Sequence, residues 1–338
     1  MTVPDVSLQS RCLATLELLP AGGLSRAAQW DLAGGRHRFP ASITLVRESV
    51  HEHRQTAMQR MSISGMQDKI SLRLHRGVLL PVQKDGTHIL KPIPSTRFHL
   101  VDDTPANEAL TMLLARRAGL TTAAHGLVRL ADSELAYITR RFDRLADGSR
   151  VLQEDLGSVA GMSADTHGGN WKYDSTYEAL GWLIKNHCSA TMRDLIEFVH
   201  RVIFCFVIGN GDAHVRNFSL IRDRDGFTQL SPAYDLLCTR VHLPDEADLG
   251  LNVLNEEKDG RFSPSYETFG FYTGADFSEL GRRLGLATTV VSQLLKTYLD
   301  PTFRLMIADY VGRSFLSQEA KLRFVITVNE RLAKLASA

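Results

Sequence analysis

The chain reads Asn210-Gly-Asp-Ala-His-Val-Arg-Asn217 in its second half, a polar stretch that sets a carboxylate and a carboxamide five residues apart. Transfer of a γ-phosphoryl group depends mostly on positioning and charge neutralisation, and the acceptor hydroxyl needs one carboxylate to receive its proton. Asp212 is the candidate for that carboxylate. Mg²⁺ prefers oxygen ligands, so the amide oxygen of Asn217 and a second carboxylate, from Asp235, would suit it.

The alternative interpretation of this stretch is an ordinary turn, because Asn, Gly and Asp dominate turns for conformational reasons alone. The flanking sequence favours the phosphotransfer interpretation. Residues 194–208 have the length and near-continuous apolarity of a buried helix. Residues 218–221 and 227–230 flank Asp223-Arg-Asp-Gly226 and predict a β-hairpin that leads to Asp235.

A lysine and a glutamate in the first half could supply the other part of such a site. Lys91 ends the apolar run His88-Ile-Leu-Lys91, a predicted strand, and could neutralise phosphate charge. Glu108 lies near the start of a helix predicted from an N-cap at Thr104 to Gly119. Glu108 could orient Lys91, as a helix glutamate does in protein kinases. Alone, Glu108 reads equally well as a first-turn acid favoured by the helix dipole.

A third piece is Ser62-Ile-Ser-Gly-Met-Gln-Asp-Lys69, which precedes the alternating strand pattern of residues 70–74. Small residues before a strand allow backbone N–H groups to approach phosphates, and Lys69 adds a charge there. With one glycine the signal is weak, and an ordinary serine-rich entry to a strand is the alternative.

Taken together, these segments resemble the HipA-like serine/threonine kinases of bacterial toxin–antitoxin systems. The matching segments occur in family order from about residue 60 to 240: Ser62–Lys69, His88–Lys91, Asn107-Glu108, Arg141-Phe-Asp-Arg144, Gln153-Glu-Asp155, Gly211–Phe218 and Tyr234-Asp235. The resemblance implies an α+β, two-lobed protein-kinase-like fold. We expect a strand-rich N-terminal lobe over residues 1–145 and a mostly helical C-terminal lobe over residues 146–338.

The resemblance also implies roles for individual residues, with ATP and Mg²⁺ as cofactors. Asp212 would accept the proton, Asn217 and Asp235 would hold Mg²⁺, and Lys91 would act with Asp212 as a catalytic residue by clamping the phosphates. The full set expected at the nucleotide is Ser64, Gly65, Met66, Gln67, Asp68, Lys69, Lys91, Glu108, Arg140, Arg141, Phe142, His214, Asn217, Tyr234 and Asp235. One departure is Arg140, because HipA has an acidic residue there, which puts side-chain contacts at the hinge in question.

Within the family, the chain is most similar to the short HipT kinases of three-component HipBST systems, because only about 60 residues precede the serine loop. The resemblance implies autophosphorylation at Ser62 or Ser64, a small HipS-like antitoxin, and a helix-turn-helix HipB-like partner that makes the DNA contact. Family members modify aminoacyl-tRNA synthetases, the tryptophanyl enzyme in the case of a HipT kinase. We therefore expect a toxin that arrests growth by phosphorylating a protein serine or threonine.

Composition agrees with a globular enzyme and excludes some other classes. The formal net charge of +1 leaves no broad basic field that would bind DNA directly. The first residues lack a signal pattern and no apolar run is long enough to span a membrane, which predicts a cytoplasmic protein. The cysteines lack metal-ligand spacing and are expected to be reduced packing residues: Cys12, Cys188, Cys205 and Cys238.

Beyond residue 150 the start signals are helical. Ser175-Thr-Tyr-Glu178 has the form of a capping box, Thr191-Met-Arg-Asp194 is a weaker version, and Asp276-Phe-Ser-Glu279 predicts a further start. The turn residues of 143–150 mark the expected boundary between the lobes.

Two other functions compete with the toxin kinase. A small-molecule kinase of the aminoglycoside phosphotransferase type shares a Gly-Asp-x-His-x-x-x-Asn loop, and only the serine loop, Arg141-Phe-Asp-Arg144 and Gln153-Glu-Asp155 favour the HipA-like interpretation. A catalytically inactive component of a repressor complex is the second alternative. The presence of Lys91, Asp212, Asn217 and Asp235 argues against it.

Overall fold

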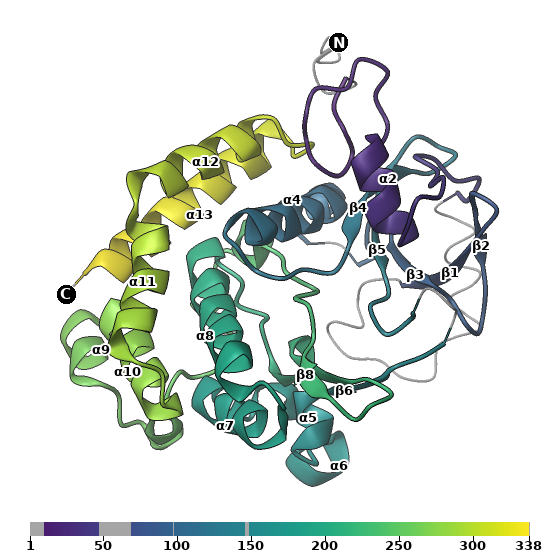
Figure 1. The fold of residues 1–338 in the computed structure, drawn as a ribbon. Coiled ribbons are helices and arrows are strands. Elements are labelled where there is room, and N and C mark those ends of the chain that lie inside the picture. The colour runs from purple at the N-terminus through teal and green to yellow at the C-terminus, as the bar shows by residue number, and fades with distance from the viewer. Residues whose placement is uncertain (1–9, 47–68, 97, 146–148, 338) are drawn as a thin grey trace. The chain divides into compact units, whose positions relative to one another are not determined.

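In a computed structural model of the chain, residues 10–46, 69–96, 98–145 and 149–337 are described (Figure 1). They divide into two compact units. The first comprises the described parts of Met1–Leu114, Ala123–Ser149 and Asp309–Lys321, and the second comprises those of Ala115–Thr122, Arg150–Ala308 and Leu322–Ala338.

The first unit is built on a five-stranded antiparallel sheet. Its strands are β1 Ile70–His75, β2 Val78–Pro81, β3 His88–Lys91, β4 His125–Arg129 and β5 Leu135–Arg140, in the order β2-β1-β3-β5-β4. The helix α2, Arg26–Ala33, packs on β4 and β5. The strand β3 coincides with the strand predicted at His88–Lys91, and β1 covers the predicted strand pattern of residues 70–74.

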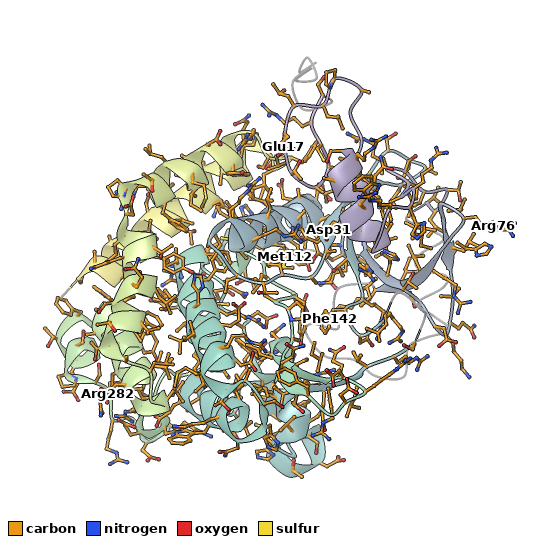
Figure 2. The ribbon with its side chains drawn as sticks, viewed as in Figure 1. Glu17, Asp31, Arg76, Met112, Phe142 and Arg282 are labelled. Atoms are coloured by element: carbon orange, nitrogen blue, oxygen red, sulfur yellow. The ribbon has the colours of Figure 1, made fainter. Side chains whose placement is uncertain are left out.

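The helix α4, Thr104–Arg117, follows a short 3-10 helix, η2, at Val101–Asp103. Met112, labelled on this helix in Figure 2, is completely buried. The prediction of Thr104 as the N-cap is wrong. Thr104 already has helical backbone angles, and its hydroxyl donates to the carbonyl of Val101 at 2.7 Å, because η2 runs directly into α4.

The second unit combines helices with a three-stranded antiparallel sheet, ordered β6-β7-β8. Its elements are β6 Leu152–Asp155, α5 Leu156–Val159, α6 Ala164–His167, η3 Trp171–Tyr173, α7 Tyr177–His187, α8 Thr191–Ile208, η4 Val215–Asn217, β7 Ser219–Arg222, β8 Thr228–Leu230, η5 Thr239–Val241, η6 Asn255–Asp259, α9 Pro264–Phe269, α10 Gly274–Leu284, α11 Thr288–Leu299, α12 Pro301–Gly312 and α13 Gln318–Ala336. The last residues of α12 and the first of α13 belong to the first unit.

The predicted buried helix and hairpin are both confirmed. Every residue of α8 from Phe198 to Ile208 is buried, and α7 packs along it. The strands β7 and β8 pair antiparallel, and Gly226 in the turn between them has φ +84°, which glycine adopts without strain. A long apolar helix is therefore followed immediately by the polar stretch of residues 210–217.

Three predicted helix starts need correction. Thr176, one residue after the predicted Ser175, caps α7 by accepting the N–H of Ala179 at 3.0 Å. Thr273 caps α10 in a capping box with Asp276, so Asp276 lies inside the helix. At the start of α8, the Thr191 hydroxyl donates to the Cys188 carbonyl at 2.9 Å and caps no helical N–H. In each case the backbone conformation just before the helix determines which side-chain hydroxyl can accept a free backbone N–H of the first turn.

Among the described residues, no helix combines the length and the apolarity that crossing a membrane requires. The four cysteines are free thiols and all are buried. The prediction that they are reduced packing residues agrees with this burial.

Candidate active site

The first unit contains the buried ion pair that the sequence predicts. Lys91 Nζ at the end of β3 lies 2.5 Å from Glu108 Oε1 on α4, and their side chains are 5% and 2% exposed. Tyr137, on the neighbouring strand β5, places its ring 5.4 Å from the same nitrogen. A lysine in this setting has a fixed position, because each charge is the partner that keeps the other tolerable in the interior.

The segment after β5 is held by paired charges. Arg141 donates to both carboxylate oxygens of Asp143, at 2.9 and 2.7 Å, and Arg144 donates to the same carboxylate. Burial raises the pKa of Asp143, but the hydrogen bonds and charges of the two arginines outweigh it and lower the pKa overall. Arg141-Phe-Asp-Arg144 is thus a local clamp, and Phe142 extends from it, half-buried (Figure 2).

Arg140 lies differently from its two neighbours. Its guanidinium covers Gly34, at the C-terminal end of α2, where an added Cβ would come within 2.1 Å of Arg140 Cζ. The structure therefore places this side chain on α2. Lys69, at the entry to β1, is exposed. The rest of the expected nucleotide loop, Ser62, Ser64, Gly65, Met66, Gln67 and Asp68, lies outside the described residues.

The second unit holds the stretch 210–217, which begins where α8 ends. Gly209 has φ +70° at the C-cap, and the N–H of Asn210 donates to the Cys205 carbonyl at 2.9 Å, which closes the last turn of the helix. Asn210 is 2% exposed, and its side-chain oxygen accepts the N–H of Asp212 at 3.2 Å. The polar loop is therefore anchored to a helix whose last eleven residues are all buried.

Asp212 has one of its carboxylate oxygens engaged. The hydroxyl of Tyr173, on η3, donates to Oδ1 of Asp212. The ring of Tyr173 meets that of His214 edge to face, with centroids 5.2 Å apart. Asp212 itself is only partly buried, as a proton acceptor for an external hydroxyl has to be.

His214 is 0% exposed, and neither of its ring nitrogens has a hydrogen-bond partner among the residues that the structure describes. Burial is the largest influence on its pKa, which is lowered, although Asp212 and Asp235 act in the opposite direction. A neutral imidazole beside Asp212 follows from this. Such a group offers one nitrogen donor and one acceptor to a ligand that enters the loop.

Asn217 and Asp235 lie together, as the metal assignment requires. Asn217 Nδ2 is 3.5 Å from Asp235 Oδ2, and Asn217 Oδ1 accepts the His214 N–H at 3.0 Å, which leaves that oxygen a second lone pair. Asp235 has φ +59°, a left-handed backbone conformation that aspartate adopts more readily than most other residues. An amide oxygen and a carboxylate in contact fit a hard divalent cation such as Mg²⁺.

Tyr234, the residue before Asp235, forms hydrogen bonds that stabilise the contact between Asn217 and Asp235. Its hydroxyl lies 2.6 Å from Ser219 Oγ and donates to the Arg216 carbonyl at 2.7 Å. Burial raises its pKa, so the hydroxyl remains protonated. Tyr234 therefore joins the chain just before Asp235 to the end of the polar loop.

Three residues that brace the loop have no signal in the sequence. Thr239 accepts the N–H of Gly211 at 2.9 Å and donates to the Glu246 carboxylate, whose pKa is raised to about 7, mainly by burial. A Cβ added at Gly250 would lie 2.8 Å from the backbone nitrogen of Ala213. These residues stand 28 to 37 positions from Gly211 or Ala213, at no regular spacing, and only the tertiary structure brings them to the loop.

The second unit has a polar loop after a buried helix and a hairpin followed by the contact of Asp235 with Asn217, and the first unit has a strand lysine paired with a helix glutamate. These are the features expected of a kinase-like phosphotransferase. The comparison with solved structures agrees on the fold. The HipA chain of a Shewanella oneidensis HipA, HipB and operator DNA complex superposes with a TM-score of 0.61 at 19% identity, covering 86% of this chain and 70% of that one. The predicted α+β, two-lobed protein-kinase-like fold is thus confirmed.

The family follows from sequence similarity. The HipA-like C-terminal domain matches residues 61–301, and the chain belongs to this family. A protein of Haemophilus influenzae named putative kinase is 30% identical over 325 residues, which cover 93% of this chain and 92% of that protein. The serine/threonine-protein kinase toxin HipA of Shewanella oneidensis is 24% identical over 302 residues, 80% of this chain and 66% of that protein. The prediction of a HipA-like protein is confirmed at the level of the family.

Proposed function

We propose that this chain is an ATP-dependent serine/threonine protein kinase, with lobes at residues 1–145 and 146–338, that acts as a toxin of the HipBST type. The observation that carries the proposal is the loop of residues 210–217. This loop contains the partly exposed Asp212 and also Asn217, whose Nδ2 lies 3.5 Å from Oδ2 of Asp235. Homologues named kinase and HipA toxin support the same chemistry.

The chemistry assigns each group one task. An acceptor hydroxyl would lie against Asp212, and its proton passes to the carboxylate as its oxygen bonds to the γ-phosphorus and the bond to the ADP oxygen breaks. Asn217 and Asp235 would hold Mg²⁺, which neutralises charge on the phosphates when bound. Lys91, whose ammonium lies 2.5 Å from the Glu108 carboxylate, would neutralise the other phosphates. His214 would donate to a phosphate oxygen.

The nucleotide would also contact Ser64 to Lys69 through their backbone, and Arg140, Arg141 and Phe142 near the adenine. Arg140 is the weakest of these assignments, since its guanidinium lies on Gly34. Tyr234 would act indirectly by holding Asp235.

The partners are proposed from the family. We propose a small HipS-like antitoxin, and a HipB-like helix-turn-helix protein through which any DNA contact is made. The Shewanella HipA structure, a complex with HipB and operator DNA, is the support for the second partner. The proposed substrate is an aminoacyl-tRNA synthetase, the tryptophanyl enzyme first, and the proposed location is the cytoplasm. A doubly charged phosphate on a synthetase loop that cradles ATP would repel the phosphates of that nucleotide.

The test of the kinase assignment compares three variants. Asp212→Ala and Asp235→Asn should each abolish ATP-dependent phosphotransfer, measured with radiolabelled ATP, and leave the melting temperature close to that of the wild type, because neither residue belongs to the core. Asp225→Ala, an exposed turn carboxylate, is the matched control and should retain full activity. Normal transfer by either site variant refutes the assignment.

Autophosphorylation needs its own measurement. Phosphopeptide mass spectrometry should find phosphate on Ser62 or Ser64 in wild-type protein and on neither in Asp212→Ala. Each phosphate carries close to two negative charges at neutral pH, which would compete with the phosphates of the nucleotide. Phosphate on neither serine in an active preparation argues against this part of the proposal.

The toxin role is tested by expression. The wild-type chain should arrest bacterial growth, raise uncharged tRNA and leave a phosphorylated synthetase in the proteome, whereas Asp212→Ala should do none of these. Co-expression of a HipS-like protein should relieve the arrest. Harmless expression of an active kinase with no synthetase modified would favour the small-molecule kinase instead.

A further inference from the structure

The carboxylate of Asp212 has an unequal environment at its two oxygens. Oδ1 accepts the hydroxyl of Tyr173, and no other side chain in the described part of the structure hydrogen-bonds to this carboxylate. The remaining contact of the residue is through its backbone N–H, to Asn210 at 3.2 Å. Oδ2 is therefore the oxygen that stays available to a hydroxyl arriving from outside.

Tyr173 is held in place on its N-terminal side. The preceding Trp171 has the guanidinium of Arg216 over its ring, 5.9 Å from the centroid, and Arg216 also lies 3.5 Å from Asp155 at the end of β6. The backbone N–H of Tyr173 donates to the Asn170 carbonyl at 2.9 Å within the 3-10 turn. Arg216 belongs to the polar stretch of residues 210–217, so it links Tyr173 to the loop that contains Asp212.

The C-terminal side of Tyr173 is also anchored. Asp174 forms an ion pair with Lys258 at 2.6 Å, and Thr176 caps α7. The Tyr173 ring itself rests edge-on against His214. Tyr173 therefore has contacts before it, after it and on its ring, and its hydroxyl donates to Asp212.

The Tyr173 hydroxyl acts as the hydrogen-bond donor in its contact with Asp212. Burial and the neighbouring Asp212 raise the pKa of Tyr173, so its hydroxyl remains protonated and donates to the carboxylate. A neutral donor fixes the carboxylate without neutralising it. Glu246, on the loop after η5, also raises the pKa of Tyr173, and Lys172 Nζ lies 5.4 Å from the centroid of the tyrosine ring.

We propose that Tyr173 is a positioning residue for Asp212, which fixes the rotamer of the carboxylate and so selects Oδ2 as the atom that receives the proton of the acceptor hydroxyl. The inference rests on the proposed kinase function. Tyr173 does not contact the reacting atoms, and its effect passes through Asp212. The competing interpretation is that its hydroxyl occupies the place of the acceptor and has to leave before catalysis.

The test uses Tyr173→Phe in the full chain, with Tyr272→Phe as the matched control. Tyr272 is a buried tyrosine that donates to the Glu257 carboxylate at 2.6 Å, so its variant loses the same kind of bond away from the loop. The loss of a carboxylate-directed hydrogen bond should lower kcat of Tyr173→Phe roughly tenfold, with KM for ATP changed less than about twofold. Tyr272→Phe should keep the wild-type kcat at a comparable loss of melting temperature.

Three results would overturn the inference. An unchanged kcat in Tyr173→Phe would show that the hydroxyl does not position the carboxylate, and a raised kcat would favour the occupied-site interpretation. An equal fall in kcat in Tyr173→Phe and Tyr272→Phe would show that the lower activity comes from lower protein stability and not from the position of the Asp212 carboxylate. If the wild-type chain transfers no phosphate, the proposed function fails first and takes the inference with it, whereas an active wild type with an unaffected Tyr173→Phe rejects the inference alone.

Discussion

The two groups of candidate site residues, one in each unit, are held in different ways. In the first unit, Lys91 and Glu108 are opposite charges 2.5 Å apart, both almost completely buried. In the second unit, the stretch 210–217 contains a partly exposed Asp212, held by a neutral phenol, by backbone hydrogen bonds and by close packing. The lysine of the first unit is held at short distance by an opposite charge, whereas Asp212 is held by hydrogen bonds from neutral groups and by packing.

The difference determines how each half responds to mutation. Loss of one member of a buried ion pair leaves the other charge without compensation, so stability and activity fall together. Loss of the Asp212 carboxylate removes one acceptor from a loop that keeps its other supports, so activity falls almost alone. An inactive Lys91 variant is therefore weaker evidence for a catalytic role than an inactive Asp212 variant.

The largest effect that sharpens this comparison is expected at the ion pair. Glu108→Ala should lower the free energy of unfolding by about 3–5 kcal/mol, measured by denaturant titration, because the buried Lys91 ammonium loses the carboxylate 2.5 Å away. The double variant Lys91→Met with Glu108→Leu should recover most of that loss while remaining inactive. A double variant as unstable as Glu108→Ala would show that packing, and not the unpaired charge, causes the loss.

A smaller effect is expected from crowding the distributed half. At Gly250 an added Cβ would lie 2.8 to 2.9 Å from backbone atoms of Ala213, so Gly250→Ala forces the loop to move. The cost should be roughly 1–3 kcal/mol of stability, accompanied by a lower kcat. Gly312→Ala, in a helix with nothing within 4 Å of the added carbon, is the control and should not lose stability. Full activity in Gly250→Ala would break the claim that packing holds the loop.

The smallest effect concerns acid. His200 on α8 is 8% exposed, and burial lowers its pKa to about 4. In the unfolded chain this imidazole binds a proton with a pKa near 6.5, whereas in the folded chain it stays neutral down to about pH 4. The free energy of unfolding therefore decreases as the pH falls from about 6.5 toward 4. At pH 5.5 this histidine should cost about 1.4 kcal/mol, which His200→Phe should remove. Thermal melts of both proteins at pH 7.5 and 5.5 would measure it, and parallel losses in the two would contradict the assignment.

Much of the fold could be predicted because its signals are local. The apolar run of residues 194–208 and the turn residues 223–226 require a buried helix and a hairpin whatever surrounds them. The helix caps were less predictable, since Thr176 and Thr273 win over neighbouring candidates through the direction in which the chain arrives. That direction is a tertiary property.

The candidate site divides along the same line. The contact of Lys91 with Glu108 and that of Asn217 with Asp235 were predicted, because each residue sits in a motif with a recognisable spacing. Tyr173 and Glu246 were not, since they lie in irregular segments and meet Asp212 and Gly211 only after folding. Residues that bind a ligand leave motifs in a sequence, whereas residues that hold those motifs in place need not.

The bond between Asp103 and Ser317 has a consequence for the order of events during synthesis. The Asp103 carboxylate, at the start of α4, accepts both the backbone N–H and the hydroxyl of Ser317, at 2.6 and 2.7 Å, across 214 positions of sequence. A ribosome makes these partners far apart in time, and closing so long a loop is entropically unfavourable until other contacts hold the chain. We therefore expect the sheet unit to be finished last although most of it is translated first. During translation, the first unit, which contains Lys91, would therefore be completed only when the ribosome has synthesised the first residues of α13.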